Sequence, residues 1–217
     1  MGNLCPFGGG VHGRGLVGDA LVVTTRSARR VPVARRLEDV ALELFATQGF
    51  DETTVDELAV AGGVGRRTFF RYFPTKLDVV LGELDEGRAG LARALAAEPG
   101  DDPVAAARAA FLAVNHYADA ELPALRRRLG LIEDVPELAA RATVRYRDWE
   151  QTLAADAARR WGVNVGGLRA QVFGRAVVAA MRAVFSAWHT RPEADADALG
   201  ALVEEAFDAL SRGFSAP

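Results

Sequence analysis

Residues 54 to 74 constrain the fold of this chain more than any other segment. Thr54 and Glu57 have the spacing of a capping box, in which each side chain accepts a hydrogen bond from the backbone N–H of the other residue, and this pattern marks the start of a helix. The pair Gly62-Gly63 interrupts that helix, and Pro74 ends the helix that follows. Two short helices joined by a glycine turn are the pattern of a helix-turn-helix.

The rest of the sequence predicts an all-α fold. Apolar residues from Leu37 to Phe45 recur at three- and four-residue intervals, which places them on one face of a helix that begins near Pro32 and stops at Gly49. No stretch has the alternation expected of a strand. Further helices are expected from the Thr75 cap to Ala97 and over residues 103–119, 123–131, 136–161, 167–190 and 194–213, between breaks at proline and glycine.

The second short helix concentrates basic and aromatic side chains. The stretch GVGRRTFFRYFPTK, residues 63–76, holds four of each kind, although the chain of 217 residues has a formal net charge of −3. Phe69 and Phe73 are one turn apart and are expected to share a buried face, which leaves the arginines outside. Taken alone, such aromatic residues are usually core and such arginines are usually solvated surface. Together with the cap and the glycine turn, they favour a helix that enters the DNA major groove.

The expected DNA contacts divide into two kinds. Arg66 or Arg67, near the helix N-terminus, has the donors that pair with guanine. Thr54, Tyr72 and Lys76 are placed to hold phosphates, which fixes the register without reading sequence. Phe70 either touches a thymine methyl or simply packs. The full set of candidate DNA-binding residues is Thr54, Gly65, Arg66, Arg67, Thr68, Phe70, Arg71, Tyr72 and Lys76.

Residues 35–85 resemble the N-terminal DNA-binding domain of the TetR family of bacterial repressors. The motifs that carry the resemblance are Leu44-Phe45, Gly49-Phe50, Thr53-Thr54-Val55, Gly62-Gly63-Val64, Thr68-Phe69-Phe70, and Tyr72-Phe73 with Lys76. The resemblance implies a homodimer on a double-stranded DNA operator, released by a small molecule bound in the C-terminal domain. This chain departs from the family at Gly62, where Ala is usual, and at Gly65 and Phe70, where many members have Ser and Tyr.

A second resemblance is to the regulators associated with mycofactocin gene clusters in actinobacteria. It rests on RRTFFRYFPTK with the following Asp-Val-Val, and on AELPALRRRLGLIEDVPELAARATVRYRDWE, residues 120–150. It implies an effector that is lipid-like, such as an acyl-coenzyme A.

The chain is therefore expected to have three parts: a disordered extension over residues 1–30, a helix-turn-helix domain over 31–77, and a helical effector-binding and dimerisation domain over 78–217. The expected function is a homodimeric repressor released from a palindromic operator by a largely apolar effector. A transcriptional activator of the same fold and a helical interaction module that has lost DNA binding are the alternatives. A lone cysteine, Cys5, indicates the cytoplasm, and no apolar run is long enough for a membrane span.

The larger domain contains the candidate effector pocket. Ligand pockets are mostly apolar with a few polar groups, although each residue of this type is more often core than pocket. The candidate lining residues are Phe111, Asn115, His116, Tyr117, Tyr146, Trp149, Phe173, Met181 and Phe185.

The last two helices contain the candidate dimer surface. Small residues recur between Leu168 and Trp188, which lets another helix approach closely, and an apolar stripe follows the final helix. Packing within one chain would also satisfy these faces, but the family resemblance favours a four-helix interface between two subunits. The candidate interface residues are Ala176, Ala180, Ala183, Leu199, Leu202, Val203, Phe207 and Leu210.

A helical enzyme that uses the same cavity is the rival class of function. His12, His116 and His189 lack the spacing of metal ligands, and the sequence has no Gly-x-Ser-x-Gly motif. We expect no catalytic residue, no metal and no cofactor.

Overall fold

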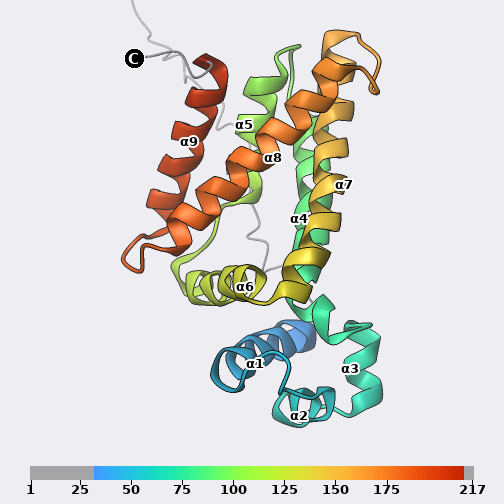
Figure 1. Ribbon diagram of the computed structural model, residues 1–217, viewed down its shortest axis with the longest axis vertical. Helices are drawn as coiled ribbons and strands as arrows, with labels where there is room; N and C mark the ends of the chain where they lie inside the picture. Colours follow the sequence, from blue (N-terminus) through green and yellow to red (C-terminus); the bar gives the residue numbers. More distant parts are fainter. Residues whose placement is uncertain (1–31, 213–217) are drawn as a thin grey trace, which may run out of the picture.

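The computed structural model describes residues 32–212. These residues form helices and no strand (Figure 1), so the predicted all-α fold is confirmed. The predicted extension over residues 1–30 lies outside the described residues. The helices are α1 (Pro32–Gln48), α2 (Val55–Ala61), α3 (Arg66–Tyr72), α4 (Lys76–Ala97), α5 (Pro103–Val114), the 3-10 helix η2 (Asp119–Glu121), α6 (Leu122–Asp134), α7 (Pro136–Trp161), α8 (Leu168–His189) and α9 (Ala196–Arg212).

The main difference from the predicted helices follows Val114. The helix expected to continue to residue 119 ends there, with Asn115 as its C-cap. The Asn115 side-chain amide and its backbone N–H both donate to the Phe111 carbonyl, at 2.9 and 3.0 Å. Asparagine offers the backbone this local alternative to a continuing helix, and a short 3-10 turn then leads into α6.

Helices α1, α2 and α3 form a small bundle at the lower end of the molecule (Figure 1). Buried side chains of this bundle, such as Phe45, Leu58 and Phe69, belong to one apolar cluster with Ile132 of α6 and Leu138 of α7. The helix-turn-helix bundle therefore shares its hydrophobic core with the adjacent parts of α6 and α7.

The upper part consists of α5, α7, α8, α9 and most of α4, with α8 crossing diagonally in front of its neighbours (Figure 1). Phe111 lies at the centre of its core, with its ring centroid 5.8 Å from that of Trp149 and 6.0 Å from that of Phe207. Leu199 and Val203 of α9 are buried in the same core.

A buried arginine closes the corner between α4 and α5. The Arg160 side chain is 1% exposed, pairs with Asp156 at 2.7 Å, and donates to the carbonyls of Leu95, Glu98 and Gly100 at 2.7, 3.1 and 2.5 Å. The last carbonyls of a helix have no partner within the helix, and this guanidinium satisfies that of the buried Leu95 while it holds the chain beyond α4 at Glu98 and Gly100.

Gly174 sets the distance between α7 and α8. A Cβ at this position would lie 2.2 Å from the backbone oxygen of Glu150, and a backbone atom cannot move without separating the two helices. We expect Gly174→Ala to lower the free energy of unfolding by about 1–3 kcal/mol through overpacking, as measured by urea denaturation.

The matched control is Gly200→Ala in α9, where a Cβ would meet no described atom within 4 Å. There the same substitution should raise the free energy of unfolding by roughly 0.5–1 kcal/mol, because glycine is the poorer helix former. Equal effects of the two substitutions would contradict the assigned role of Gly174.

Candidate DNA-binding surface and effector cavity

Local hydrogen bonds define the helix-turn-helix. The Thr54 backbone N–H donates to Glu57 Oε2 at 2.7 Å and the Glu57 N–H donates to Thr54 Oγ1 at 3.3 Å, so the predicted capping box is formed. The bond from the Thr54 backbone lowers the pKa of the Glu57 carboxyl. The turn closes with the Val64 N–H donating to the Ala59 carbonyl at 2.9 Å, and Gly63 has a φ of +65°, which favours glycine.

The structure gives a reason for glycine at position 62, where the family usually has alanine. A Cβ on Gly62 would lie 2.2 Å from Cδ2 of Leu37, a fully buried side chain of α1. The turn therefore approaches α1 more closely than alanine allows with Leu37 in this position. Leu37 of α1 therefore packs directly against the turn.

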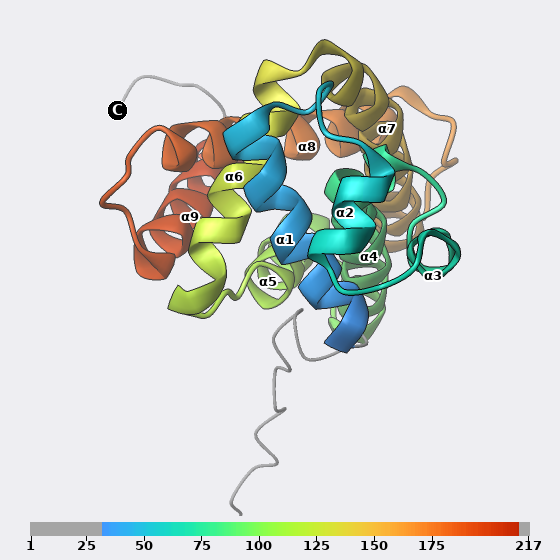
Figure 2. The same cartoon turned by 90° about the horizontal axis from the view of Figure 1, so that it is seen from below.

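Two buried rings anchor α3. Phe69 is fully buried and its ring lies 5.7 Å from that of Phe73, as the spacing predicted. Arg66, Arg67, Phe70 and Arg71 are exposed on the other side of the helix. Figure 2 views the molecule from below and shows α2 and α3 next to one another, with α3 at the edge of the bundle.

The arginines of α3 differ in their surroundings. Arg66 forms an ion pair with Asp56 of α2 at 2.7 Å and lies over the Phe70 ring, 5.4 Å from its centroid. Arg71 stacks on the Tyr72 ring at 5.0 Å. Arg67 has no hydrogen bond or ion pair with another residue in the part of the chain that the structure describes. Of these arginines, Arg67 can bind DNA without breaking an internal contact, and Asp56 is a residue that the sequence analysis missed.

The structure places Lys76 differently from the predicted phosphate contact. Its Nζ donates to the carbonyls of Phe50 and Thr53 at 2.5 and 3.1 Å and lies 4.3 Å from the centroid of the Phe50 ring. These carbonyls precede α2, so Lys76 ties the start of α4 to the start of the helix-turn-helix. Thr54 is likewise occupied as a cap, Gly65 is the N-cap of α3 without a side-chain bond, and Thr68 is half-buried.

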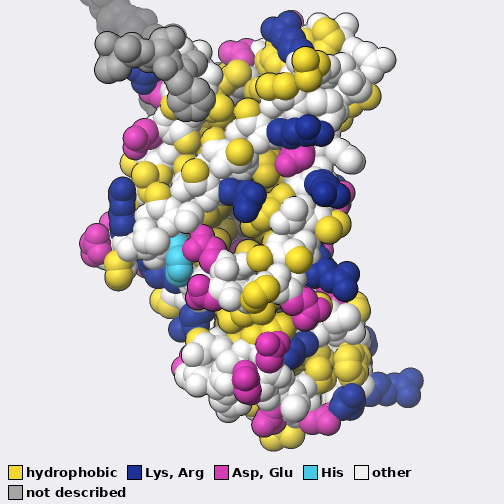
Figure 3. Space-filling view, viewed as in Figure 1, with side chains coloured by type: hydrophobic (Ala, Val, Ile, Leu, Met, Phe, Trp, Pro, Cys, Tyr) yellow, Lys and Arg dark blue, Asp and Glu magenta, His cyan; other side chains and the backbone are white. Residues whose placement is uncertain are grey.

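A cavity of about 530 Å³ lies in the larger domain between α4, α5, α6, α7 and α8. Figure 3 shows its opening as a hollow with a hydrophobic floor and charged side chains around it. Seven of the nine predicted residues line it: Phe111, Asn115, Tyr117, Tyr146, Trp149, Met181 and Phe185.

His116 and Phe173 do not line this cavity, and the prediction is corrected for both. His116 follows the C-cap of α5 and is exposed, because the helix ends before the position at which it would have turned inward. The Phe173 ring packs edge-on against Trp161 at 5.4 Å, beyond the end of the cavity.

Several lining residues come from α4 and α6, where the sequence analysis had named none. They include Glu83 and Leu84 of α4 and Arg128 and Glu133 of α6, together with Arg182 of α8. Arg128 and Glu133 of α6 could have been identified from the sequence, because they are charged residues at core-facing positions of an amphipathic helix.

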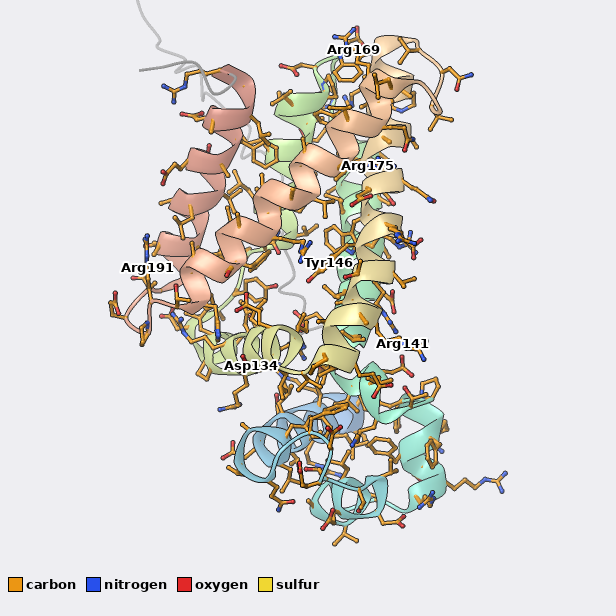
Figure 4. All side chains as sticks on the ribbon, in the orientation of Figure 1. Asp134, Arg141, Tyr146, Arg169, Arg175 and Arg191 are labelled. Atoms are coloured by element: carbon orange, nitrogen blue, oxygen red, sulfur yellow. The ribbon has the colours of Figure 1, made fainter. Side chains whose placement is uncertain are left out.

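Tyr146 and Arg182 form the polar side of the cavity. Tyr146 points from α7 toward α8 (Figure 4), and the Arg182 guanidinium lies 4.9 Å from the centroid of its ring. Burial raises the pKa of the Tyr146 phenol, and the charge of Arg182 opposes part of this rise. The phenol therefore stays protonated at neutral pH and can donate a hydrogen bond to a ligand.

Arg128 is a buried charge in the cavity wall. Its Nε donates to the Val80 carbonyl at 3.1 Å, and its terminal nitrogens pair with Glu38 of α1 and Glu83 of α4. The side chains of Arg128, Glu38 and Glu83 are 7%, 8% and 16% exposed. We call these three residues the Arg128 triad. Its neighbours differ, since Arg127 is half-buried, 3.9 Å from Glu43, and Arg126 caps the end of α8.

The predicted dimer residues separate into two sets. Leu199, Val203 and Phe207 are at most 1% exposed and fill the core of this same chain, so the prediction is corrected for them. The apolar face of an amphipathic helix usually packs against its own domain, and here α5 and α8 cover the apolar face of α9. The remaining residues are exposed or half-buried: Ala176, Ala180, Ala183, Leu202 and Leu210.

The fold and these sites define a helix-turn-helix regulator of transcription that binds DNA. The family model for bacterial regulatory proteins of the tetR family matches residues 37–82, and the model of the MftR C-terminal domain matches residues 101–215. The chain therefore belongs to the TetR family of transcriptional regulators, whose members are regulators and not enzymes. None of the helices within residues 32–212 is both long and apolar enough to span a bilayer.

Relatives extend over most of the chain. MftR of Mycobacterium tuberculosis, whose name links it to mycofactocin biosynthesis, is 33% identical over 190 residues, which cover 85% of this chain and 92% of MftR. TcmR of Streptomyces glaucescens is 36% identical over 178 residues, covering 78% of this chain and 79% of TcmR. Thermus thermophilus FadR, a repressor solved with lauroyl-CoA, has a TM-score of 0.54 and 26% identity, and the match covers 85% of this chain and 96% of FadR.

The surroundings of the arginines on α3 predict distinct effects of mutation. Arg67→Ala should cost about 1–3 kcal/mol of binding to the preferred duplex and should relax specificity at one base pair, as expected for a bidentate contact to guanine. The measurement is fluorescence anisotropy at fixed salt, on duplexes with each base pair substituted in turn.

Lys76→Met provides the comparison, because Lys76 is held by carbonyls of its own chain. It should lower thermal stability and leave the base preference and the salt dependence of DNA binding unchanged. A uniform loss of affinity on all duplexes for Arg67→Ala, with a shallower salt dependence, would instead assign Arg67 to a phosphate.

Proposed function

We propose that this protein is a homodimeric repressor that binds a roughly palindromic operator in the cytoplasm and is released by a small, largely apolar effector. The observation that carries the proposal is the course of α4. Its residues Val79 and Leu81 are buried in the core shared with the helix-turn-helix, and Glu83 and Leu84, two to three residues further on, line the cavity. A ligand in the cavity thus touches the helix on which the DNA-binding bundle rests. An activator of the same fold is the alternative, and the position of the operator relative to the promoter decides between the two.

The lining of the cavity favours an effector with an apolar chain and an anionic end. Phe111, Trp149 and Met181 provide an apolar interior, and Arg182 provides a positive charge beside the Tyr146 phenol. The volume of about 530 Å³ lies within the range of ligand sites, roughly 300–1,000 Å³. An acyl-coenzyme A has both parts, and the complex of the related FadR with lauroyl-CoA supports this class.

Lauroyl-CoA is the probe for this proposal. It should bind the protein and weaken its binding to a duplex selected from a random pool by about 5–150-fold, the usual range of allosteric coupling. Isothermal titration calorimetry measures the first effect and anisotropy the second, with coenzyme A alone as the control for the acyl chain. Binding of lauroyl-CoA with no effect on DNA affinity would contradict an effector role.

Arg182→Gln should weaken lauroyl-CoA binding by about tenfold, equivalent to roughly 1.4 kcal/mol, because the anionic end of the ligand loses its cation. Arg175→Gln is the matched control on the same helix (Figure 4), since Arg175 is exposed, lies 3.9 Å from Glu150 and does not line the cavity. Equal losses from the two variants would indicate long-range attraction to positive charge and no specific contact with Arg182.

The dimer in this proposal uses the small and apolar residues that the chain leaves partly exposed on α8 and α9. Ala176 and Ala180 of α8 allow the close approach of a second helix, and both are half-buried. Leu202 and Leu210 of α9 are also half-buried and pack against the same core cluster as Ala180. Two-fold symmetry then places two α3 helices on successive turns of the duplex, which is why the operator is expected to be palindromic.

Ala176→Arg should convert the dimer to a monomer at micromolar concentration, because a long charged side chain prevents close helix packing. Sedimentation equilibrium measures the mass, and Ala155→Arg on the exposed face of α7 is the control. A wild-type protein that sediments as a monomer, or a variant that remains a dimer, would exclude this surface.

A further inference from the structure

We infer that the Arg128 triad transmits occupancy of the cavity to the helix-turn-helix, with Arg128 as the residue that senses the ligand and Glu38 as the residue that moves α1. The inference deepens the proposed function and rests on it for the identity of the ligand site. It assigns the coupling to one buried ion pair and not to the contact between domains as a whole.

First, Arg128 lies in the wall of the cavity, where a ligand can contact it. Arg128 and Glu83 line the main cavity of about 530 Å³ and also a second cavity of about 200 Å³ on the side of α1. Glu38 lines the second cavity and not the main one. The Arg128 guanidinium thus lies in the wall that both cavities share, as Glu83 does, and its other partner, Glu38, lies on the side of α1.

The second step is competition for the guanidinium. A carboxylate, phosphate or carbonyl oxygen of a ligand that reaches this wall is an acceptor for Arg128, and charge-assisted bonds in a buried site are strong. Glu38 lies on the side of α1 and does not line the main cavity, so a guanidinium that moves toward the ligand moves away from Glu38. An apolar ligand end that presses on the same wall displaces the guanidinium by volume, because packed interiors leave it little free space.

The third step is the response of α1. Glu38 is 6% exposed, and weakening the ion pair of a carboxylate at that depth with Arg128 makes its buried position less favourable. The preceding residue on α1, Leu37, is the residue packed under the turn at Gly62. A shift of α1 that exposes Glu38 therefore moves the contact that positions the turn before α3.

A second ion pair between the same two helices serves as a comparison. Arg127 of α6 lies 3.9 Å from Glu43 of α1, and these side chains are 35% and 65% exposed. Solvent screens such a pair, and Arg127 does not line the main cavity. It joins α6 to α1 without contact with the ligand space.

The test compares Glu38→Gln with Glu43→Gln. Both remove one negative charge from α1 and one ion pair to α6, and glutamine at position 38 keeps a hydrogen-bond acceptor for Arg128. The measured quantity is the ratio of DNA dissociation constants with and without saturating lauroyl-CoA. Glu38→Gln should bring this ratio close to one, whereas Glu43→Gln should keep the wild-type ratio. The DNA-free Glu38→Gln protein should bind lauroyl-CoA at least as tightly as the wild type, because the ligand no longer competes with the Glu38 carboxylate for Arg128. A wild-type ratio in Glu38→Gln, or equal losses in both variants, would overturn the inference.

A second experiment needs no ligand, so it tests the role of the Arg128 triad independently of whether lauroyl-CoA is the effector. If the wild-type protein fails to bind lauroyl-CoA, the proposed class of effector is contradicted. The role of the triad is then tested with Ala139→Phe, a substitution on α7 that fills part of the cavity with a larger side chain. This substitution should weaken DNA binding at least fivefold in the wild-type background and not in Glu38→Gln, in line with the usual range of coupling, about 5–150-fold. Equal weakening in both backgrounds, or none in the wild type, would overturn the role of the triad.

Discussion

The ion pairs of Arg128 with Glu38 and Glu83 are the interaction on which the organisation of this protein depends. A buried guanidinium must be neutralised, and removing one partner of a buried pair typically costs about 3–5 kcal/mol. The two carboxylates come from α1 and α4 and the guanidinium from α6, so these helices are fixed relative to one another by a charge requirement as well as by packing. The helix-turn-helix is thereby attached to the wall of the cavity.

The two functional ends of the molecule are consequently parts of one packed unit. The core of the small bundle continues into α6 and α7, and α4 passes from that core to the cavity within a few residues. Such a junction suits a regulator, because any change at the cavity wall must be accommodated by helices that also hold the DNA-binding bundle. It also explains why two charged residues of the cavity wall, Arg128 and Glu83, belong to the ion pairs that reach α1.

Sequence reasoning succeeded where the deciding interaction is local. The Thr54 capping box, the turn at Gly63 and the shared buried face of Phe69 and Phe73 depend on residues a few positions apart, and all were predictable from spacing. It failed where a side chain finds its partner far along the chain. Lys76 reaches carbonyls 23 and 26 residues away, and the apolar stripe of α9 is covered by its own domain.

The sequence by itself determined the helical elements, the glycine turn and the separation of aromatic from basic residues on α3, because periodicity and capping act over one or two helical turns. Only the tertiary structure decided what each charge does. Arg126, Arg127 and Arg128 are consecutive and chemically identical, yet one caps α8, one is half-buried near Glu43 and one is buried against Glu38, 90 residues away. Successive residues of a helix point in different directions, and spacing places Arg128 on the core-facing side of α6. The partners that each arginine meets are set by what packs around the helix, and spacing within α6 does not name them.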